Sequence, residues 1–589
     1  MNSAFSVLDY VVFFAYAALI LFVGLFVSRN KHGNQKTTQE YFLADKSLPW
    51  WVIGATLICS NISAEQIIGM SGTGFKLGLA VASYEWMAAA TLILVGKFLL
   101  PIYLKENIWT MPQFLQKRFD NRVRTTMAIF WLAVYVFVNL TTVTYLGALT
   151  MKTVFGVPLF WGILGLGLFS CMYSIKGGLQ AVAWTDVLQV TVLVAGGLVT
   201  TYVGLHAISG GEGIVAGFKM VLQKAPEHFH MILDRKNYPD DYTSLPGLSV
   251  LVGGMWIVNL SYWGFNQYIT QRAFAAKSLQ EAQKGVIFAG YLKLVVPFIV
   301  VIPGIVAYLC FESEYNGKNI LDKTGKYSIV KNMVWEKDSV SVSKGDKVIY
   351  KAPNESRTVD LESFKDAKKP VIEMVKAEVV KPDNAYPALL AYVPSGIKGL
   401  AIAALFAAIV AALSSMINSI STIFTMDLYR EYINKGASEH KLVFVGRIVA
   451  VASLVIAIPV AMLLQRVEQV FQVIQEFTGF ISPGVLAIFL AGFFWKRTTA
   501  NAALWAAIIT IPLALALKFI FPALPFIDRM GIVFLILCAM IIVISLLGSK
   551  VDSTKAINLE KGIFHTSFRF NMAALGIILI LAFLYTVFW

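Results

Sequence analysis

The chain has 589 residues, of which 57% are hydrophobic and only 14% are charged, and its formal net charge is +14. Soluble globular proteins carry charge on roughly a quarter of their residues, so this composition excludes an ordinary soluble domain and predicts an integral membrane protein. In such a protein the surplus of Lys and Arg reports loop orientation, and the positive charge therefore does not indicate a nucleic-acid partner. The four cysteines show no metal-binding or disulfide spacing.

Fourteen apolar segments follow one another along the chain, and each supplies the ~20 residues that a membrane-spanning helix requires. We therefore predict an all-α membrane protein with 14 transmembrane helices. The segments are 7–28, 49–74, 77–103, 124–155, 158–175, 182–206, 247–270, 279–311, 395–425, 441–465, 467–495, 499–521, 528–547 and 568–589.

Lys and Arg gather in the odd-numbered connections between these segments. Examples are Arg29 and Lys36 in the first connection, Arg272 in the seventh, and Lys496 and Arg497 in the eleventh. Because positive loops stay on the cytoplasmic side, the odd-numbered connections are predicted to be cytoplasmic and both termini external.

Two predicted external connections are long, 207–246 and 311–394, and the second is rich in charge. Residues 340–350 alternate apolar and polar side chains around Gly345, which predicts a small β-hairpin. The pattern assigns no role to this loop. On the opposite side, 109–119 is predicted to form an amphipathic helix on the inner face.

The stretch 59–70 places Asn61, Ser63, Glu65 and Gln66 inside an apolar run. Polar groups at bilayer depth are expensive and usually face a cavity or one another. We predict a discontinuous helix here, of the kind that exposes backbone groups to a substrate and its ion in secondary transporters. The alternative is a helix contact made by small and polar residues.

A second apolar run, around 256–267, is interrupted in the same way. Five spans separate the two runs, so units of five spans enter the membrane from opposite sides, which predicts an inverted five-plus-five repeat. The predicted organisation is an extra N-terminal helix and loop, the first repeat, an external loop, the start of the second repeat, the long charged loop, the remainder of the second repeat, and three C-terminal helices. These parts correspond to 1–48, 49–206, 207–246, 247–310, 311–394, 395–497 and 498–589.

Helical spacing groups several polar and aromatic side chains. Residues three or four apart share a helix face, as do Gln66 with Met70, Asn259 with Tyr262, and Phe471 with Gln475. Tyr84 and Glu85 open the third span, and Lys293 lies deep in the eighth. Carboxylate, ammonium, amides and aromatic rings together fit a sugar, whose hydroxyls donate and accept while its C–H faces pack on rings. A structural Lys293–Glu85 ion pair and ordinary aromatic packing are the alternatives.

Other function classes lack support. The sequence contains no G-x-x-x-x-G-K-[ST] phosphate loop and no H-E-x-x-H motif. An ATP-driven pump and an intramembrane metalloprotease are therefore disfavoured, and no enzyme activity is predicted.

Several long motifs resemble the sodium/solute symporter family, with the closest likeness to bacterial sodium/galactose and animal sodium/glucose cotransporters. The motifs lie at 51–69, 84–87, 177–186, 263–268 and 424–427. The resemblance implies fourteen helices around an inverted repeat, a sugar substrate and Na⁺ as the coupling ion. It covers nearly the whole chain apart from about 311–385.

The resemblance also implies roles for individual residues. Hydrogen bonds to the sugar would come from Gln66, Glu85, Asn259, Lys293 and Gln475, and Tyr262 would stack on it from the inner side. The outer lid would be Met70, Tyr84 and Phe471, whereas Trp263 would act with Tyr262 in inward release; Asn61, Ser63 and Asn139 would support the site.

Two departures from the family pattern concern specificity and coupling. A pocket serine is replaced by Ala88, which removes one hydrogen bond to a hydroxyl. The usual sodium site combines carbonyls, here at Cys59, Ile62 and Ala408, with two serines, and those serines are replaced by Ala411 and Ala412. Some members hold a second sodium at an aspartate and two serines, which correspond to Asp186, Ser414 and Ser415. We therefore hypothesise that these three residues form the working cation site; a proton site and a capping role for Asp186 are the alternatives.

The sequence thus predicts a sodium-coupled symporter that imports a hexose such as galactose or glucose by alternating access. A uniporter, a proton-coupled symporter and a non-transporting sugar sensor remain alternatives, and myo-inositol or a sugar acid stays open as substrate. The expected location is a bacterial inner membrane, with the lipid bilayer and the sugar as partners, no nucleic acid and no obligate protein partner.

Overall fold

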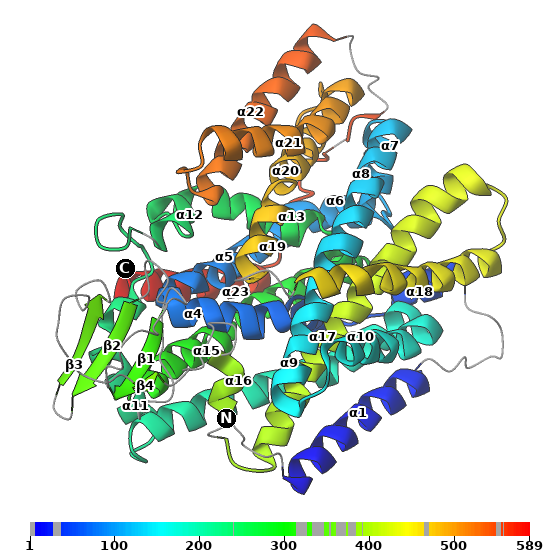
Figure 1. Cartoon of the computed structure of the whole chain (residues 1–589). Coiled ribbons are helices and arrows are strands. Elements are labelled where there is room, and N and C mark those ends of the chain that lie inside the picture. The colour runs from blue at the N-terminus through cyan, green and yellow to red at the C-terminus, as the bar shows by residue number, and fades with distance from the viewer. Residues whose placement is uncertain are drawn as a thin grey trace, which may run out of the picture.

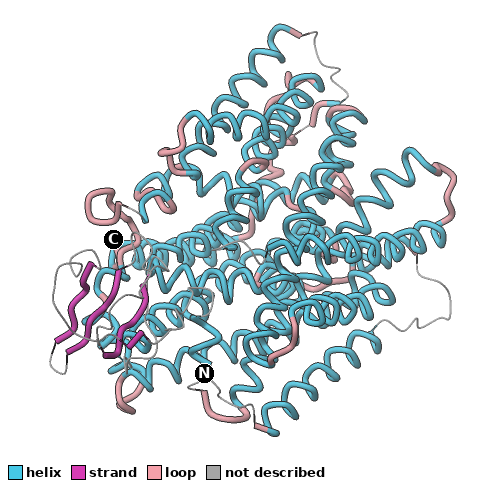
Figure 2. Tube along the Cα trace, in the orientation of Figure 1, coloured by secondary structure: helices cyan, strands magenta, loops and turns pink. Residues whose placement is uncertain are grey.

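The structure is a computed structural model of the whole chain. It describes residues 6–27, 37–239, 241–313, 327–332, 347–352, 355–360, 373–374, 385–390, 393–464, 470–548, 555–557 and 559–589. Over these residues the apolar segments form a bundle of helices, and a small sheet lies at one end beside the C-terminus (Figures 1 and 2). The helical, membrane-embedded class predicted from the sequence is therefore confirmed for the body of the protein.

The first half of the bundle begins with α1 (Val7–Val27) and continues to a helix of 50 residues, α10. Between them lie α2 (Thr38–Leu43), η1 (Ala44–Lys46), α3 (Trp50–Asn61), η2 (Glu65–Met70), α4 (Ser71–Leu77), η3 (Gly78–Ala82), α5 (Ser83–Leu94), η4 (Val95–Leu99), α6 (Leu100–Lys105), α7 (Met111–Arg118), α8 (Asn121–Val134), η5 (Tyr135–Leu140) and α9 (Thr141–Phe155), before α10 (Leu159–Ile208).

The second half contains the most deeply buried helix, α17, together with the three helices that end the chain. Its elements are α11 (Ile214–Lys224), η6 (Pro226–Phe229), η7 (Asp241–Thr243), α12 (Leu248–Val252), α13 (Gly254–Phe265), α14 (Gln267–Phe274), α15 (Leu279–Ser313), α16 (Ala385–Leu389), α17 (Ile397–Ile423), η11 (Phe424–Ile433), α18 (Glu439–Leu463), α19 (Val470–Gly479), α20 (Ser482–Phe494), α21 (Ala500–Ile520), α22 (Phe526–Leu547) and α23 (Phe568–Val587).

Each of the fourteen predicted segments coincides with helical elements over the residues described. By length and hydropathy, eleven helices in the described part of the chain qualify as membrane spans, or twelve if the pair around Gly253, bent by 76°, counts as one. The number is lower because Glu65–Lys105 counts as one span across two predicted segments, the first arm of α10, Leu159–Met172, is too short to qualify, and the pair around Gly253 is bent. The span count of fourteen therefore stays a prediction.

Gly178 divides α10 into two arms. Its backbone angles, φ 62° and ψ −155°, are the only non-helical ones within that helix. A Cβ at this position would lie 2.3 Å from the carbonyl oxygen of Tyr41 on α2. Glycine is required here because the angles lie where a side chain is strained and because α2 packs directly against the joint.

Two helices are interrupted in the middle of the bundle, as predicted. α3 ends at Asn61, where Ile62 takes extended angles (φ −76°, ψ 109°). α13 ends at Phe265, where Asn266 takes nearly the same angles (φ −79°, ψ 123°). Each break frees backbone groups from helical hydrogen bonding, and such groups are tolerated at membrane depth only where protein or a cavity surrounds them.

The core of the bundle is formed by α3, α10, α15 and α17, in which α3 and α10 pack against each other and against both α15 and α17. Within α17, 94% of the most apolar window is buried, whereas the value for α22 is 28%. The outer helices expose large apolar side chains such as Leu535 on α22 and Phe583 on α23, each 66% exposed. An exposed apolar band of this kind is suited to lipid, so the bundle has a protein core and a lipid-facing rim.

The described strands lie in the long connection between α15 and α16. They are β1 (Tyr327–Asn332), β2 (Lys347–Ala352), β3 (Glu355–Asp360) and β4 (Glu373–Met374), in the order β3-β2-β1-β4. The predicted hairpin around Gly345 is wrong in its pairing, because the antiparallel partner of β2 is β3, which follows it, and β1 runs parallel to β2. Alternation identified β2 as a strand but carried no information about its partner; 340–346 lie outside the described residues.

α7 corresponds to the predicted amphipathic helix at 109–119. Its apolar face is buried against protein, since the ring of Phe114 lies 4.4 Å from Phe493 and 5.4 Å from Phe489, both on α20. Arg118 at its end is also buried and donates to the carbonyl oxygen of Gly492 at 2.8 Å. The helix is confirmed, and its amphipathic pattern serves packing within the protein.

Candidate functional site

A polar cavity lies between the two helix breaks. It holds about 100 Å³ of free space and is lined from α3, η2, α5, α8, η5, α13, α14, α15, α17, α19 and α20. The lining contains every predicted sugar-contacting residue, namely Gln66, Glu85, Asn259, Tyr262, Lys293 and Gln475. It also contains Met70, Tyr84, Ala88 and Trp263.

Lys293 and Glu85 form an ion pair on the wall of this cavity. They lie on α15 and α5, are 1% and 3% exposed, and bond directly to each other. The same ammonium group donates to the side-chain oxygen of Asn61 at the end of α3, and it lies 5.1 Å from the centre of the Trp263 ring. A buried pair is retained at little cost only when further hydrogen bonds satisfy it, and Asn61 supplies one.

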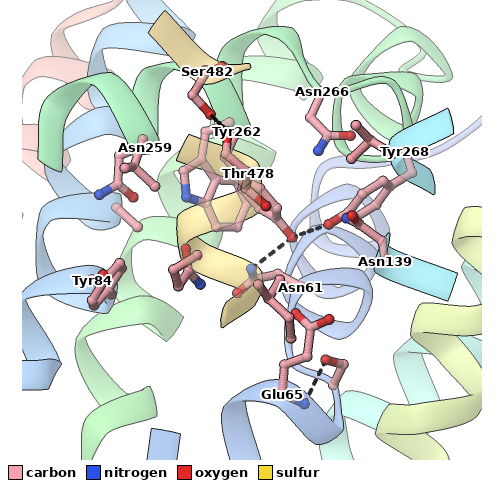
Figure 3. Close-up of a pocket in the computed structure, with 18 of the residues that line it drawn as sticks. Asn61, Glu65, Tyr84, Asn139, Asn259, Tyr262, Asn266, Tyr268, Thr478 and Ser482 are labelled. Atoms are coloured by element: carbon pink, nitrogen blue, oxygen red, sulfur yellow. Dashed lines mark hydrogen bonds between the residues drawn. The ribbon is translucent and has the colours of Figure 1, made fainter. Parts of the chain in front are cut away.

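A chain of hydrogen bonds continues from Asn61 across the floor of the cavity (Figure 3). The Asn61 amide donates to the Tyr262 hydroxyl at 2.9 Å, and the Tyr268 hydroxyl donates to the same oxygen at 2.8 Å. Tyr262 and Tyr268 lie on α13 and α14, on opposite sides of the break at Asn266. The two broken helices are therefore joined by side chains where their backbones are interrupted.

The first break is held by a small polar turn. The side-chain oxygen of Gln66 accepts from both the backbone nitrogen and the hydroxyl of Ser63, each at 3.0 Å. The backbone nitrogen of Glu65 donates to the Ser63 hydroxyl at 3.1 Å. These bonds replace helical ones across 62–64 and fix the orientation of Gln66 at the cavity.

Aromatic side chains close the cavity on one side. Tyr84 lines the cavity and meets the ring of Phe471 on α19 edge to face, with 5.7 Å between ring centres. Phe471 also lies against Gly69, where an added Cβ would come within 2.8 Å of the phenylalanine Cβ. Among the predicted gate residues, Phe471 therefore packs behind Tyr84 instead of lining the cavity.

α19, which carries Phe471 and Gln475, is tied to the C-terminal helices. Glu476 pairs with Lys518 of α21 at 2.9 Å and with Arg529 of α22 at 2.8 Å. These two ion pairs hold α19 against α21 and α22. They therefore also help to position Gln475, the neighbouring residue, at the cavity wall.

Sequence reasoning missed several residues of the cavity. Tyr135 on η5 donates to the side-chain oxygen of Asn266 at 2.5 Å and accepts from the backbone nitrogen of Gln267 at 2.9 Å, so it fastens the second break. Glu65 lines the cavity with one carboxylate oxygen that has no hydrogen-bond partner in the described structure. Glu65 and Asn266 lie in the two interrupted apolar runs described above, but their spacing did not indicate a place in the cavity. Tyr268, Thr478 and Ser482 also line the cavity.

The positions expected to form the usual sodium site are buried, but two of them offer no side-chain oxygen. Cys59, Ile62 and Ala408 are fully buried, as are Ala411 and Ala412. A hard cation such as sodium prefers several oxygen ligands, and the two alanine methyl groups supply none. In the described part of the chain, no three His, Cys, Asp or Glu side chains gather into a metal-binding group.

Part of the alternative cation site does come together. Asp186 on α10 is fully buried and accepts a hydrogen bond from Thr56 of α3, one turn before Ser60. The Ser60 hydroxyl lies 2.9 Å from that of Ser415 on α17, so successive turns of α3 contact Asp186 and Ser415. Ser414 instead donates to the carbonyl oxygen of Val410 at 2.7 Å.

Arg272 also belongs to this group, which the sequence did not predict. Its position after an apolar run predicted a cytoplasmic loop charge, but the side chain is fully buried. It donates to the hydroxyl of Ser415 and lies near enough to Asp186 for electrostatic attraction. The expected loop placement is therefore wrong, because a charge that gains buried partners need not remain in water.

Comparison with known proteins gives three findings. The model of the sodium:solute symporter family matches residues 41–341 and 364–510. The chain is 47% identical to a sodium/glucose cotransporter of Vibrio parahaemolyticus over 99% of this chain and 98% of that one, and 32% identical to sodium/myo-inositol cotransporter 2 of Mus musculus over 86% and 69%. A solved Na⁺-coupled sialic acid symporter, in a substrate-bound outward-open state, has a similar fold with a TM-score of 0.73, 21% identity, and coverage of 93% of this chain and 100% of that one.

Proposed function

Because the chain belongs to the sodium:solute symporter family, we propose that it imports a hexose, such as glucose or galactose, together with sodium by alternating access. Membership makes the protein a multi-span membrane transporter and not an enzyme, and it indicates sodium as the coupling ion. What we propose beyond family membership is the identity of the sugar and of the residues that bind it.

The observation that supports a sugar is the mixture of groups in one cavity. Glu85 accepts, Lys293 donates, and Gln66, Asn259 and Gln475 can do both, all within one lining. A site built to hydrogen-bond hydroxyls rejects analogues that lack them, because its own buried groups would then be left unpaired. A polyol with hydroxyls around a compact ring is the small solute that pairs with such a lining.

The proposed division of labour follows the placement of the residues. The five polar side chains hold the hydroxyls, whereas Tyr262 supports the ring from the inner side. Met70, Tyr84 and Phe471 form the lid, and Trp263 holds the Lys293 ammonium by the cation–π contact described above. Ala88 leaves one hydroxyl of the sugar without a partner on α5, which lowers discrimination by about 1 kcal/mol.

The proposed working cation site is Asp186 with Ser414 and Ser415. The carbonyls at Cys59, Ile62 and Ala408 belong to the usual site of the family, whose two serines are replaced here by Ala411 and Ala412. A carboxylate oxygen of Asp186 without a partner supports a cation ligand there. Each sodium that crosses 100 mV contributes about 2.3 kcal/mol, which corresponds to a roughly 40-fold accumulation of sugar at equal sodium concentrations.

Topology completes the proposal. We infer that both termini and the connection carrying β1–β4 are external, and that the membrane is a bacterial inner membrane. The inverted repeat is proposed to comprise 49–206 and 247–497, interrupted by the loop at 311–394; 1–48 and 498–589 flank it.

Uptake into proteoliposomes tests the proposal directly. Labelled glucose and galactose would be offered with an inward sodium gradient, with an inward proton gradient, and with neither. Accumulation above the external concentration under sodium alone is the expected result. Accumulation under protons alone would identify a proton symporter instead.

The same assay tests two further readings. Equal equilibration in all three conditions would identify a uniporter, the reading that Ala411 and Ala412 favour. Binding without flux would identify a sensor. Competition by unlabelled myo-inositol, the solute named for the mouse relative, measures how strictly the cavity requires a hexose, and a stronger effect than that of glucose would overturn the hexose assignment.

A further inference from the structure

Arg272 is a buried cation whose guanidinium is incompletely satisfied. It is fully buried on α14 and donates to the carbonyl oxygen of Tyr268 at 2.6 Å and to the hydroxyl of Ser415. Its Nε has no hydrogen-bond partner in the described structure. A buried donor without a partner costs roughly 1–3 kcal/mol. Arg118, which caps α20, also retains one unmet nitrogen in the described structure, so what distinguishes Arg272 is the acid in its surroundings.

Asp186 is incompletely satisfied in the same cluster. One carboxylate oxygen accepts from Thr56, whereas the other has no partner. Gln189, three residues further along α10, is also fully buried, and its amide nitrogen has no partner. An acid and a base, each with an unmet atom in the described structure, therefore belong to one cluster of side chains from α3, α10, α14 and α17.

We propose that Arg272 is an internal counter-cation, which neutralises Asp186 when sodium is absent and is displaced from the Asp186–Ser415 region when sodium binds. This inference rests on the proposed sodium site at Asp186. It adds that the protein contains its own competitor for that site.

The charge of Arg272 acts differently with and without bound sodium. A buried carboxylate without a counter-charge is strongly unfavourable, and Arg272 supplies that charge in the ion-free protein. When sodium enters, two cations would share one carboxylate, and like charges at close range repel in a medium of low dielectric. The guanidinium then withdraws from Ser415, whose hydroxyl becomes available to the ion.

Displacement of Arg272 would also be transmitted to the sugar cavity. Arg272 bonds to the backbone of Tyr268, one turn earlier on α14, and the Tyr268 hydroxyl bonds to Tyr262 in the cavity floor. α14 begins directly after the extended residue Asn266, so it can shift without carrying α13 with it. The same side chain therefore connects sodium occupancy to the position of the floor.

The test is sodium-dependent thermal stability of the purified full-length protein, with choline chloride replacing sodium chloride at constant ionic strength. A ligand that binds only the folded state stabilises it by RT ln(1 + c/Kd) at ligand concentration c, so the dependence of Tm on sodium concentration yields an apparent Kd, here called the sodium midpoint. We expect Arg272→Gln to lower Tm in choline and to lower the sodium midpoint by at least about tenfold. Arg118→Gln is the matched control, because Arg118 is equally buried but caps α20; it should lower Tm with an unchanged sodium midpoint.

Two outcomes separate failure of this inference from failure of the sodium site. If Asp186→Asn retains the full sodium-dependent shift at the same midpoint, the proposed sodium site is wrong. If Asp186→Asn abolishes the shift but Arg272→Gln leaves the midpoint unchanged or weakens sodium binding, the site stands and Arg272 is only structural.

A double variant covers the case in which Arg272→Gln does not fold. Arg272→Gln with Asp186→Asn removes both charges, so it should fold and show a higher Tm in choline than Arg272→Gln. A double variant no more stable than the single one would show that Arg272 does not neutralise Asp186, and would overturn the inference.

Discussion

Two buried acid–base groups lie in this bundle, and they are built differently. In the sugar cavity, Lys293 and Glu85 bond directly and Asn61 completes the shell of the ammonium. In the inner cluster, Arg272 bonds to Ser415 and Asp186 to Thr56, and Ser60 of α3 connects the two contacts through its own bond to Ser415; within the described structure Asp186 and Arg272 each retain an atom without a partner. A satisfied pair keeps its shape while a neutral solute comes and goes, whereas an unsatisfied pair can accept a new charge.

The largest effect is expected from breaking the satisfied pair. Lys293→Met leaves Glu85 buried without its counter-charge, which should destabilise the protein by about 3–5 kcal/mol and abolish sugar uptake. Thermal unfolding and proteoliposome uptake measure the two effects. Adding Glu85→Gln should restore most of the stability without restoring uptake, and recovery of uptake by the double variant would show that the pair is structural only.

Removing the negative charge of Asp186 should abolish the coupling of sugar uptake to sodium without abolishing sugar transport. With Asp186→Asn, accumulation driven by sodium and a membrane potential of 100 mV should fall from roughly 40-fold to none, while sugar still equilibrates without a gradient. Uptake time courses with and without the potential separate these components. Loss of equilibration together with accumulation would mean that Asp186 also supports the sugar cavity, which would erase the distinction between the two groups.

The contact between the two regions can be weakened at Tyr262. Tyr262→Phe leaves the Asn61 amide and the Tyr268 hydroxyl without their shared acceptor, which costs about 1–3 kcal/mol and should lower kcat/KM for sugar about tenfold. Tyr291→Phe is the matched control, because its hydroxyl donates to the carbonyl of Ala573 away from the cavity. Equal losses in the two variants would indicate a general packing effect.

The smallest effect concerns specificity. Ala88 is buried at the cavity wall, and Ala88→Ser adds one hydroxyl there. One such hydrogen bond contributes about 1 kcal/mol, so the ratio of glucose to galactose KM should change by about fivefold. The ratio is measured from competitive uptake of both sugars, and an unchanged ratio would place the epimeric hydroxyl elsewhere.

Much of the fold was predictable because its signals are local. Apolar runs identified the helical segments, and clustered polar residues identified both interrupted helices. The joint at Gly178 and the partner of β2 were not predictable, since they depend on what packs against them. Sequence also placed each of the six sugar-contacting candidates, whose common cavity is confirmed, although their contacts with a sugar remain a prediction.

The sequence did not reveal which charged residues near helix ends are buried and which lie in loops. Arg272 and Arg118 both follow or precede apolar runs and fit the pattern of cytoplasmic loop charges, yet both are buried. The positive-inside pattern counts Lys and Arg residues near the ends of spans without regard to whether each side chain points into water or into the protein. Only the fold shows that Arg118 caps a helix while Arg272 donates to Ser415 in the cluster that contains Asp186.

The joint at Gly178 has a practical consequence for mapping the protein. The chain passes from one arm of α10 to the other through a single residue, and α2 covers that residue. Proteases cut, and inserted epitopes are accepted, at exposed loop tips. A tag placed at this connection would therefore force the two arms apart and report misfolding, whereas the exposed residues Lys435 and Gly436, between η11 and α18, offer a usable insertion point.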